Sequence, residues 1–157
     1  MRFEHLVEIN DLTQPEVRVL EREELWRGLV VRAEHPELFL PSLEGAPILT
    51  RTPDGLVREL TFGELRITDQ VRFFASEVLY EIPPQGEIPR SSLRMSIEEP
   101  LPGQLFVRFV YEDERAPESE PEMAARRSAY EAADVDTVAI IRELAEAGEL
   151  ARRTAAS

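Results

Sequence analysis

The sequence predicts an α+β domain in which one antiparallel sheet wraps around a long C-terminal helix. Six segments of β character follow one another between residues 46 and 112 with only short turns between them, and such short connections imply antiparallel neighbours. A single long stretch of helical periodicity then occupies residues 120–150. A sheet with one apolar face needs a cover, and this helix is the only element large enough to provide it.

The N-terminal region predicts one strand and one helix. Residues 2–10 alternate between apolar and polar side chains, which is typical of a strand with one buried face, and His5 falls on the buried side. Residues 21–34 carry apolar side chains at helical spacing, with acids in the first turn. His35-Pro36 ends this helix, because a residue before proline avoids the α region. The following PELFLP predicts one short helical turn.

The central region predicts a meander. Its β segments are separated by glycine- and proline-rich turns and cover residues 46–52, 56–63, 65–74, 77–82, 91–99 and 104–112. We expect the strand at 2–10 to join one edge of this sheet.

The hairpin around Gly63-Glu64 has a predictable register. A two-residue type II′ loop with glycine first pairs Phe62 with Leu65, Leu60 with Ile67, Arg58 with Asp69 and Leu56 with Val71. A slip of one residue would bury the polar side chains instead. Arg58 and Asp69 are therefore expected to be direct neighbours, within salt-bridge distance, on the concave face.

The C-terminal region predicts a linker, a helix and a tail. The acidic stretch 112–122 should be a solvated linker. Ser119 and Glu122 fit a capping box at the start of the helix. Asp134 lies inside the apolar stripe of that helix, together with Met123, Tyr130, Thr137, Val138, Ile141, Leu144 and Ala145. The tail 151–157 should fray, and 1–157 should form one domain.

Composition argues against several functions. The net charge is −13, which disfavours nucleic acid and anionic membrane surfaces as partners. There is no cysteine and there are only two histidines, so we expect no metal site. No apolar run is long enough to insert in a membrane, and no phosphate-binding loop or nucleophile motif is present. We expect a cytoplasmic protein without a cofactor.

Three segments, MRFEHLVEIN, LWRGLVVRAEHPELFLP and PDGLVRELTFG, closely resemble the AtaL-like family of the SRPBCC superfamily. This is the helix-grip superfamily of START domains and the birch-pollen allergen. The resemblance is strong over the first half of the chain, and the rest agrees in pattern only. It implies a helix-grip fold with a deep cavity between the sheet and the C-terminal helix that holds an apolar small molecule.

The candidate site consists of side chains on the inner faces of these elements. Four are ionisable, namely His5, Arg58, Asp69 and Asp134; the others are Trp26, Leu60, Phe62, Val71, Phe73, Tyr80, Met95, Phe109, Tyr111, Tyr130 and Ile141. Arg58 and Asp69 are either an ion pair near a sheet edge or a polar anchor inside the cavity. His5 is either a hydrogen-bonded structural residue or a cavity acid/base, and Asp134 has the same two alternatives.

Three functions agree with these features. The first is binding or carrying an apolar or aromatic small molecule. The second is an enzyme of the aromatase/cyclase or isomerase type that acts on a polyketide-like or other hydrophobic metabolite. The third is an interaction protein whose cavity has collapsed and whose acidic face binds a basic partner. Neither the ligand nor the oligomeric state is encoded in a recognisable motif.

Overall fold

The structure is a computed structural model that describes residues 1–150. Seven strands and two α-helices follow one another as β1 (Arg2–Glu8), α1 (Arg22–Glu34), a 3₁₀ turn η1 (Pro36–Leu38), β2 (Ile48–Thr52), β3 (Gly55–Phe62), β4 (Leu65–Phe73), β5 (Glu77–Ile82), β6 (Ser91–Leu101), β7 (Gln104–Asp113) and α2 (Glu120–Glu146). The element order is the predicted one. The expected fraying of residues 151–157 lies outside the described residues.

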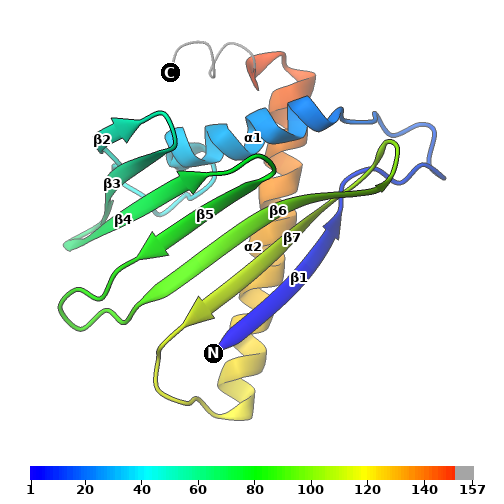
Figure 1. The fold of residues 1–157 in the computed structure, drawn as a ribbon. Helices are drawn as coiled ribbons and strands as arrows, with labels where there is room; N and C mark the ends of the chain where they lie inside the picture. Colours follow the sequence, from blue (N-terminus) through cyan, green and yellow to red (C-terminus); the bar gives the residue numbers. More distant parts are fainter. Residues whose placement is uncertain (151–157) are drawn as a thin grey trace.

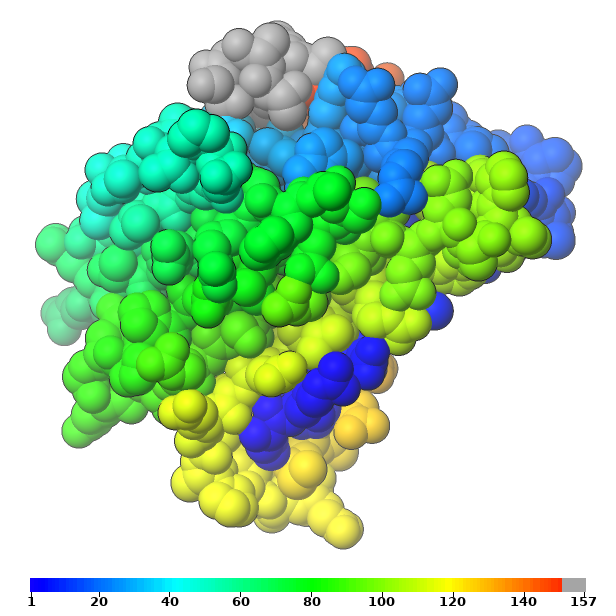
Figure 2. All heavy atoms as spheres, viewed as in Figure 1, coloured from blue at the N-terminus to red at the C-terminus, as the bar shows by residue number. Residues whose placement is uncertain are grey.

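The strands form one antiparallel sheet in the order β1-β7-β6-β5-β4-β3-β2. β2 to β7 are a meander, and β1 pairs with β7 at the edge, as predicted. Figure 1 shows α2 running behind the curved sheet, and α1 crossing α2 near the C-terminal end of α2. In the space-filling view from the same side, strand side chains cover the sheet and hide most of α2 (Figure 2).

The β3–β4 hairpin has the predicted register. Each of the four expected pairs is present, including Arg58 with Asp69. Gly63 has a φ of +61°, and no residue other than glycine has a positive φ among those described. That combination is typical of a type II′ turn, in which only the first central residue needs a positive φ. The turn therefore determines which side chains of both strands face α2.

α2 is shorter than expected at its C-terminal end. Its N-terminus is where the sequence places it, because the Ser119 hydroxyl accepts a hydrogen bond from the Glu122 N–H at 3.3 Å. The helix ends at Glu146, just before Gly148, whose φ is +70°. The acidic connection is also shorter than the stretch 112–122, because β7 continues to Asp113 and α2 begins at Glu120.

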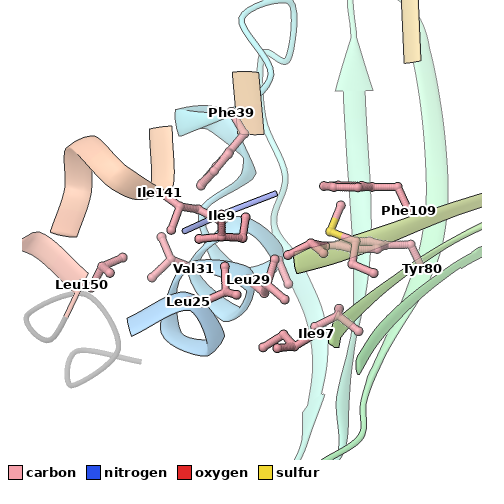
Figure 3. Packing of buried hydrophobic residues seen from close by; sticks show 14 of the residues in the cluster. Ile9, Leu25, Leu29, Val31, Phe39, Tyr80, Ile97, Phe109, Ile141 and Leu150 are labelled. Carbon is pink, nitrogen blue, oxygen red and sulfur yellow. The ribbon is translucent and has the colours of Figure 1, made fainter. Parts of the chain in front are cut away.

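The hydrophobic core lies where α1 crosses the sheet. Leu25 and Leu29 of α1 are fully buried, and they belong to one cluster with Ile141 of α2 and the strand residues Ile97 and Phe109 (Figure 3). The two helices approach closely at Gly28, since a Cβ added there would lie 2.4 Å from Ile141 Cγ2. A larger residue would require a shift of the Ile141 side chain or of one helix.

Candidate functional site

A cavity of about 250 Å³ lies between the concave face of the sheet, the end of α1 and the middle of α2. Its wall is formed by Arg32, Leu40, Arg58, Leu60, Asp69, Tyr80, Ile82, Ser91, Ser92, Leu93, Tyr111, Glu112, Asp113, Arg115 and Tyr130. A water molecule occupies only about 30 Å³ of liquid, so the predicted hollow is present. It is slightly smaller than typical sites for drug-sized ligands, which begin at roughly 300 Å³. The third function required a collapsed cavity and is not supported.

Strand register explains why the hollow occupies only one end of the concave face. Side chains that face each other across neighbouring strands form rows. One row, which we call the packed row, contains Phe73, Val78, Met95 and Phe109, and it lies in the same core cluster as Leu25 and Leu29 of α1.

The opposite end of the concave face is not covered by α1. There Arg58 pairs with Asp69, while Ile82, Ser91 and Asp113 follow one another across β5, β6 and β7. α1 has 13 residues and is therefore about 20 Å long at 1.5 Å per residue. It stops at Glu34, before His35-Pro36, and the cavity begins where this cover ends.

Arg58 and Asp69 form a buried bidentate ion pair at the cavity wall. The Nε–Oδ1 and Nη2–Oδ2 distances are 2.9 and 2.5 Å, and both side chains are 3% exposed. Burial acts to lower the pKa of Arg58, but the hydrogen bonds and charge of Asp69 raise it above its usual value. The predicted adjacency is confirmed. The pair lies on β3 and β4, close to the edge strand β2, but it is buried and not solvated.

Arg58 also connects the hairpin to α1. Its Nη1 donates a hydrogen bond to the Ala33 carbonyl at 2.8 Å. A cation is stabilised at a helix C-terminus, where unpaired carbonyls carry partial negative charge. All three hydrogen bonds of Arg58 are made within the protein, so this residue has a structural role that the strand pattern did not reveal.

Arg32 and Tyr80 carry the buried polar side-chain atoms of the wall that have no hydrogen-bond partner. The Arg32 guanidinium lies over the Tyr80 ring, with Cζ 5.1 Å from the ring centroid. Arg32 Nε and the Tyr80 hydroxyl are both buried, and neither has a hydrogen-bond partner. Tyr80 was predicted as a site residue and Arg32 was not.

Arg32 could have been found from the helical periodicity. It lies seven residues after Leu25 and three after Leu29, so a helical wheel places it on the apolar face of α1. A charged residue within an apolar stripe is the same signal that identified Asp134.

His5, Asp134 and Tyr111 form a hydrogen-bonded chain that joins three elements. His5 Nδ1 of β1 lies 3.1 Å from Asp134 Oδ2 of α2, and the Tyr111 hydroxyl of β7 donates to Asp134 Oδ1. The Tyr111 ring stacks on Tyr130, with centroids 3.9 Å apart and an interplanar angle of 9°. Tyr111 and Tyr130 line the cavity, whereas Asp134 and His5 lie behind them.

The environment of this chain shifts two pKa values. Burial raises the pKa of Asp134, against the hydrogen bonds from Tyr111 and His5, which act to lower it. Burial also raises the pKa of Tyr111 far above its usual range, and the charge of Asp134 raises it further. Tyr111 is therefore a hydrogen-bond donor at neutral pH, and Asp134 gives up its proton less readily than an ordinary aspartic acid.

The remaining predicted residues lie outside the cavity wall, with the exception of Leu60. Val71, Met95, Phe109 and Ile141 are fully buried in the core cluster. Phe73 is partly buried, and its ring contacts Trp26 edge-on at 6.4 Å; Phe62 is half-buried next to the hairpin turn. Val71, Met95 and Phe109 are strand residues packed in the core cluster with α1, whereas Trp26 and Ile141 belong to α1 and α2 themselves. Phe62 lies outside this cluster. The role of these residues as ligand contacts stays a prediction.

Within residues 1–150, no group of three or more histidine, aspartate or glutamate side chains is arranged to hold a metal ion. No helix in this part of the chain is long and apolar enough to cross a membrane.

A curved antiparallel sheet gripping a long C-terminal helix, with a cavity between them, defines a protein of the helix-grip fold. The family model described as acetylaranotin biosynthesis cluster protein L (AtaL) matches residues 7–148. The chain therefore belongs to the AtaL family.

Solved structures of the same fold are distant in sequence. The Zhui aromatase/cyclase from Streptomyces sp. R1128 is 17% identical, with a TM-score of 0.59 over 98% of this chain and 95% of that chain. Ara h 8.0201 is 14% identical, with a TM-score of 0.59 over 90% of this chain and 97% of that chain. The di-domain aromatase/cyclase StfQ of the steffimycin biosynthetic pathway is 10% identical, with a TM-score of 0.66 over 92% of this chain and 50% of that chain. These likenesses show the fold. A search of the curated proteins found no significant match.

Proposed function

We propose that the chain binds or carries a small apolar or aromatic molecule in the cavity between the sheet and α2. The observation that carries this proposal is the cavity of about 250 Å³ at the uncovered end of the concave face. Its apolar wall comes from Leu40, Leu60, Ile82 and Leu93, and the stacked Tyr111–Tyr130 pair adds aromatic surface. An apolar cavity with a few polar groups for orientation is the usual form of a small-molecule site.

Native mass spectrometry of the protein purified from its own source tests this proposal. We expect a second species, heavier than the bare chain by the mass of a retained small molecule. A Leu93→Trp variant, which fills the cavity, should lose that species while keeping the far-UV circular dichroism of the wild type. Retention of the same molecule by this variant would contradict binding in the cavity.

A second candidate function is catalysis of the aromatase/cyclase type, and the His5–Asp134–Tyr111 chain favours it. A carboxylic acid with a raised pKa, in contact with a histidine and with a tyrosine at the cavity wall, is a typical arrangement for proton transfer. Two of the structural neighbours are described as aromatase/cyclases. Cyclisation followed by aromatisation of a poly-carbonyl chain removes water and needs such a proton donor and acceptor.

Comparing the molecules retained by the wild type and by Asp134→Asn distinguishes the two candidates. An enzyme would accumulate its substrate in the variant, so the retained masses would differ by one or more water molecules. A carrier would retain the same molecule in both proteins. The proposed location is the cytoplasm, which cell fractionation with an antibody against the chain would test.

A further inference from the structure

We propose that the molecule held in the cavity is an organic anion, with an apolar ring system and one carboxylate or equally acidic oxygen bound between Arg32 and Tyr80. This inference rests on the proposed function and specifies its ligand class. It follows from three features: a cation without a counter-ion, a hydroxyl without a partner, and a wall whose other charged side chains are paired.

Arg32 lacks a counter-ion within the part of the chain that the structure describes. The other two arginines of the wall are paired, Arg58 with Asp69 and Arg115 with Asp113, at 2.5 and 2.6 Å. No carboxylate among residues 1–150 lies within salt-bridge distance of Arg32, and its buried Nε has no hydrogen-bond partner.

The carboxylates around Arg32 are already engaged. Glu34, two residues further along α1, forms an ion pair with Arg51 at 3.3 Å, although its buried Oε2 has no hydrogen-bond partner. Glu112 of the wall pairs with Arg2 at 3.4 Å. Asp134 accepts from Tyr111 and contacts His5. Moving Glu34 to Arg32 would leave Arg51 unpaired, and moving Asp134 would remove the acceptor of Tyr111 and the partner of His5. Only Glu112 could move without such a loss, because Arg2 would keep Glu4 at 3.0 Å.

The Tyr80 hydroxyl lies on the same wall and is equally without a partner. The guanidinium groups of Arg32 and Arg58 both lie over the Tyr80 ring, with their Cζ atoms 5.1 and 5.2 Å from the ring centroid. Arginine can only donate hydrogen bonds, and a tyrosine hydroxyl donates readily. The missing partner of this pair is therefore an acceptor.

An anionic acceptor matches this site better than a neutral one. A carbonyl oxygen would satisfy one donor but would leave the charge of Arg32 uncompensated in a partly buried site, where charges interact more strongly than in water. A carboxylate compensates the charge and accepts from the planar guanidinium and the hydroxyl together. The rest of the ligand should be mainly apolar, because four aliphatic side chains and a stacked tyrosine pair contribute to the wall, with Ser91 and Ser92 as its uncharged polar members.

Isothermal titration with 2-naphthoate and 2-naphthamide tests the inference, because the two probes share one shape and differ in charge. We expect the wild type to bind 2-naphthoate at least roughly tenfold more tightly than 2-naphthamide. Arg32→Gln should abolish this preference by lowering the affinity for 2-naphthoate. Its affinity for 2-naphthamide should stay within about twofold of the wild-type value. Tyr80→Phe, which removes only the hydroxyl, should lower the affinity for 2-naphthoate by about threefold or more.

Arg66→Gln is the matched control. It removes the same charge from the outer face of β4, where the Arg66 side chain is 73% exposed and lies outside the cavity wall, so we expect wild-type affinities. Equal affinity of the wild type for both probes would overturn the inference and leave the proposed function intact. Loss of affinity for both probes to the same extent in Arg32→Gln would also overturn it. If the wild type binds neither probe at millimolar concentration, the inference is overturned, and the proposed function then depends on the outcome of native mass spectrometry.

Discussion

At the scale of single residues, the buried environment of Asp134 changes the pH at which its carboxyl loses its proton. It is 1% exposed and lies between His5 and the Tyr111 hydroxyl. Burial raises its pKa in the folded protein, while unfolding returns it to about 3.8. The neutral carboxyl is favoured by the folded state. The resulting stabilisation is therefore fully present below pH 3.8 and is lost as the pH rises through the raised folded-state pKa.

Asp134→Asn replaces this carboxyl with a neutral group of the same shape. We expect the free energy of unfolding of the wild type to decline relative to that of the variant as the pH rises from about 3.8 towards 7. Urea unfolding of both proteins over this range measures the difference. Asp136→Asn, which changes an exposed acid two residues away, is the control. A wild type that gains stability relative to Asp134→Asn over this range would contradict the assignment.

The Arg58–Asp69 pair should be sensitive to loss of one partner. Asp69→Ala leaves a buried guanidinium without its counter-ion, and breaking such a pair costs about 3–5 kcal/mol. Replacing both residues, as in Arg58→Met with Asp69→Leu, should recover most of that loss, because the desolvation of two charges is removed together. Urea unfolding provides the measurement.

The exposed pair on the outer face of the same hairpin is the control for Asp69→Ala. Arg66 and Glu59 lie 4.0 Å apart, and Glu59→Ala should cost less than about 1 kcal/mol. A similar cost for Glu59→Ala and Asp69→Ala would show that burial of the Arg58–Asp69 pair does not determine its contribution.

At the scale of elements, the close approach of α1 and α2 depends on Gly28. This position lies inside a helix, where alanine is favoured over glycine by about 1 kcal/mol. The packing nevertheless excludes a side chain, because a Cβ at residue 28 would lie 2.4 Å from Ile141 Cγ2 and 2.9 Å from Ile141 Cγ1. Tertiary contact therefore outweighs helix propensity here.

We expect Gly28→Ala to lower the free energy of unfolding by about 1–3 kcal/mol, because overpacking forces the helices apart. In an Ile141→Ala background the penalty should disappear, and a double-mutant cycle measures this coupling. Gly45→Ala is the control, since an added Cβ there would contact nothing within 4 Å. A stabilising effect of Gly28→Ala in the wild-type background would contradict the packing.

At the scale of the whole molecule, the concave face has a packed end under α1 and a hollow end beyond it. Met95 lies in the packed row and is fully buried, whereas Ile82 borders the cavity and is half-buried. The same kind of truncation should therefore have different consequences at the two ends.

Met95→Ala should lower the free energy of unfolding by about 2–5 kcal/mol, since it opens a void in close-packed surroundings. Ile82→Ala should cost less stability, because its side chain already borders a void, but it should weaken binding of 2-naphthoate. Urea unfolding and isothermal titration of both variants test this division. Equal losses of stability at the two positions would contradict it.

The sequence by itself determined the order of the strands, the register of the β3–β4 hairpin and the face on which its side chains lie. Alternation with period two assigns Arg58, Tyr80 and Tyr111 to the concave face, and the Gly63 turn sets the pairing of Arg58 with Asp69. These features are local, because each depends on neighbouring residues or on one two-residue turn. The apolar stripe of α2, with Asp134 inside it, follows in the same way from helical periodicity.

Only the tertiary structure decided which part of the concave face is hollow and which polar groups meet there. Periodicity states which face a side chain occupies but not how far along the strand a covering helix reaches, so Met95 and Phe109 could not be separated from Tyr80 and Tyr111. The contact of His5 with Asp134 joins residues 129 positions apart, and the unpaired state of Arg32 depends on every acid around it. Such features arise from the packing of distant elements, which no local pattern encodes.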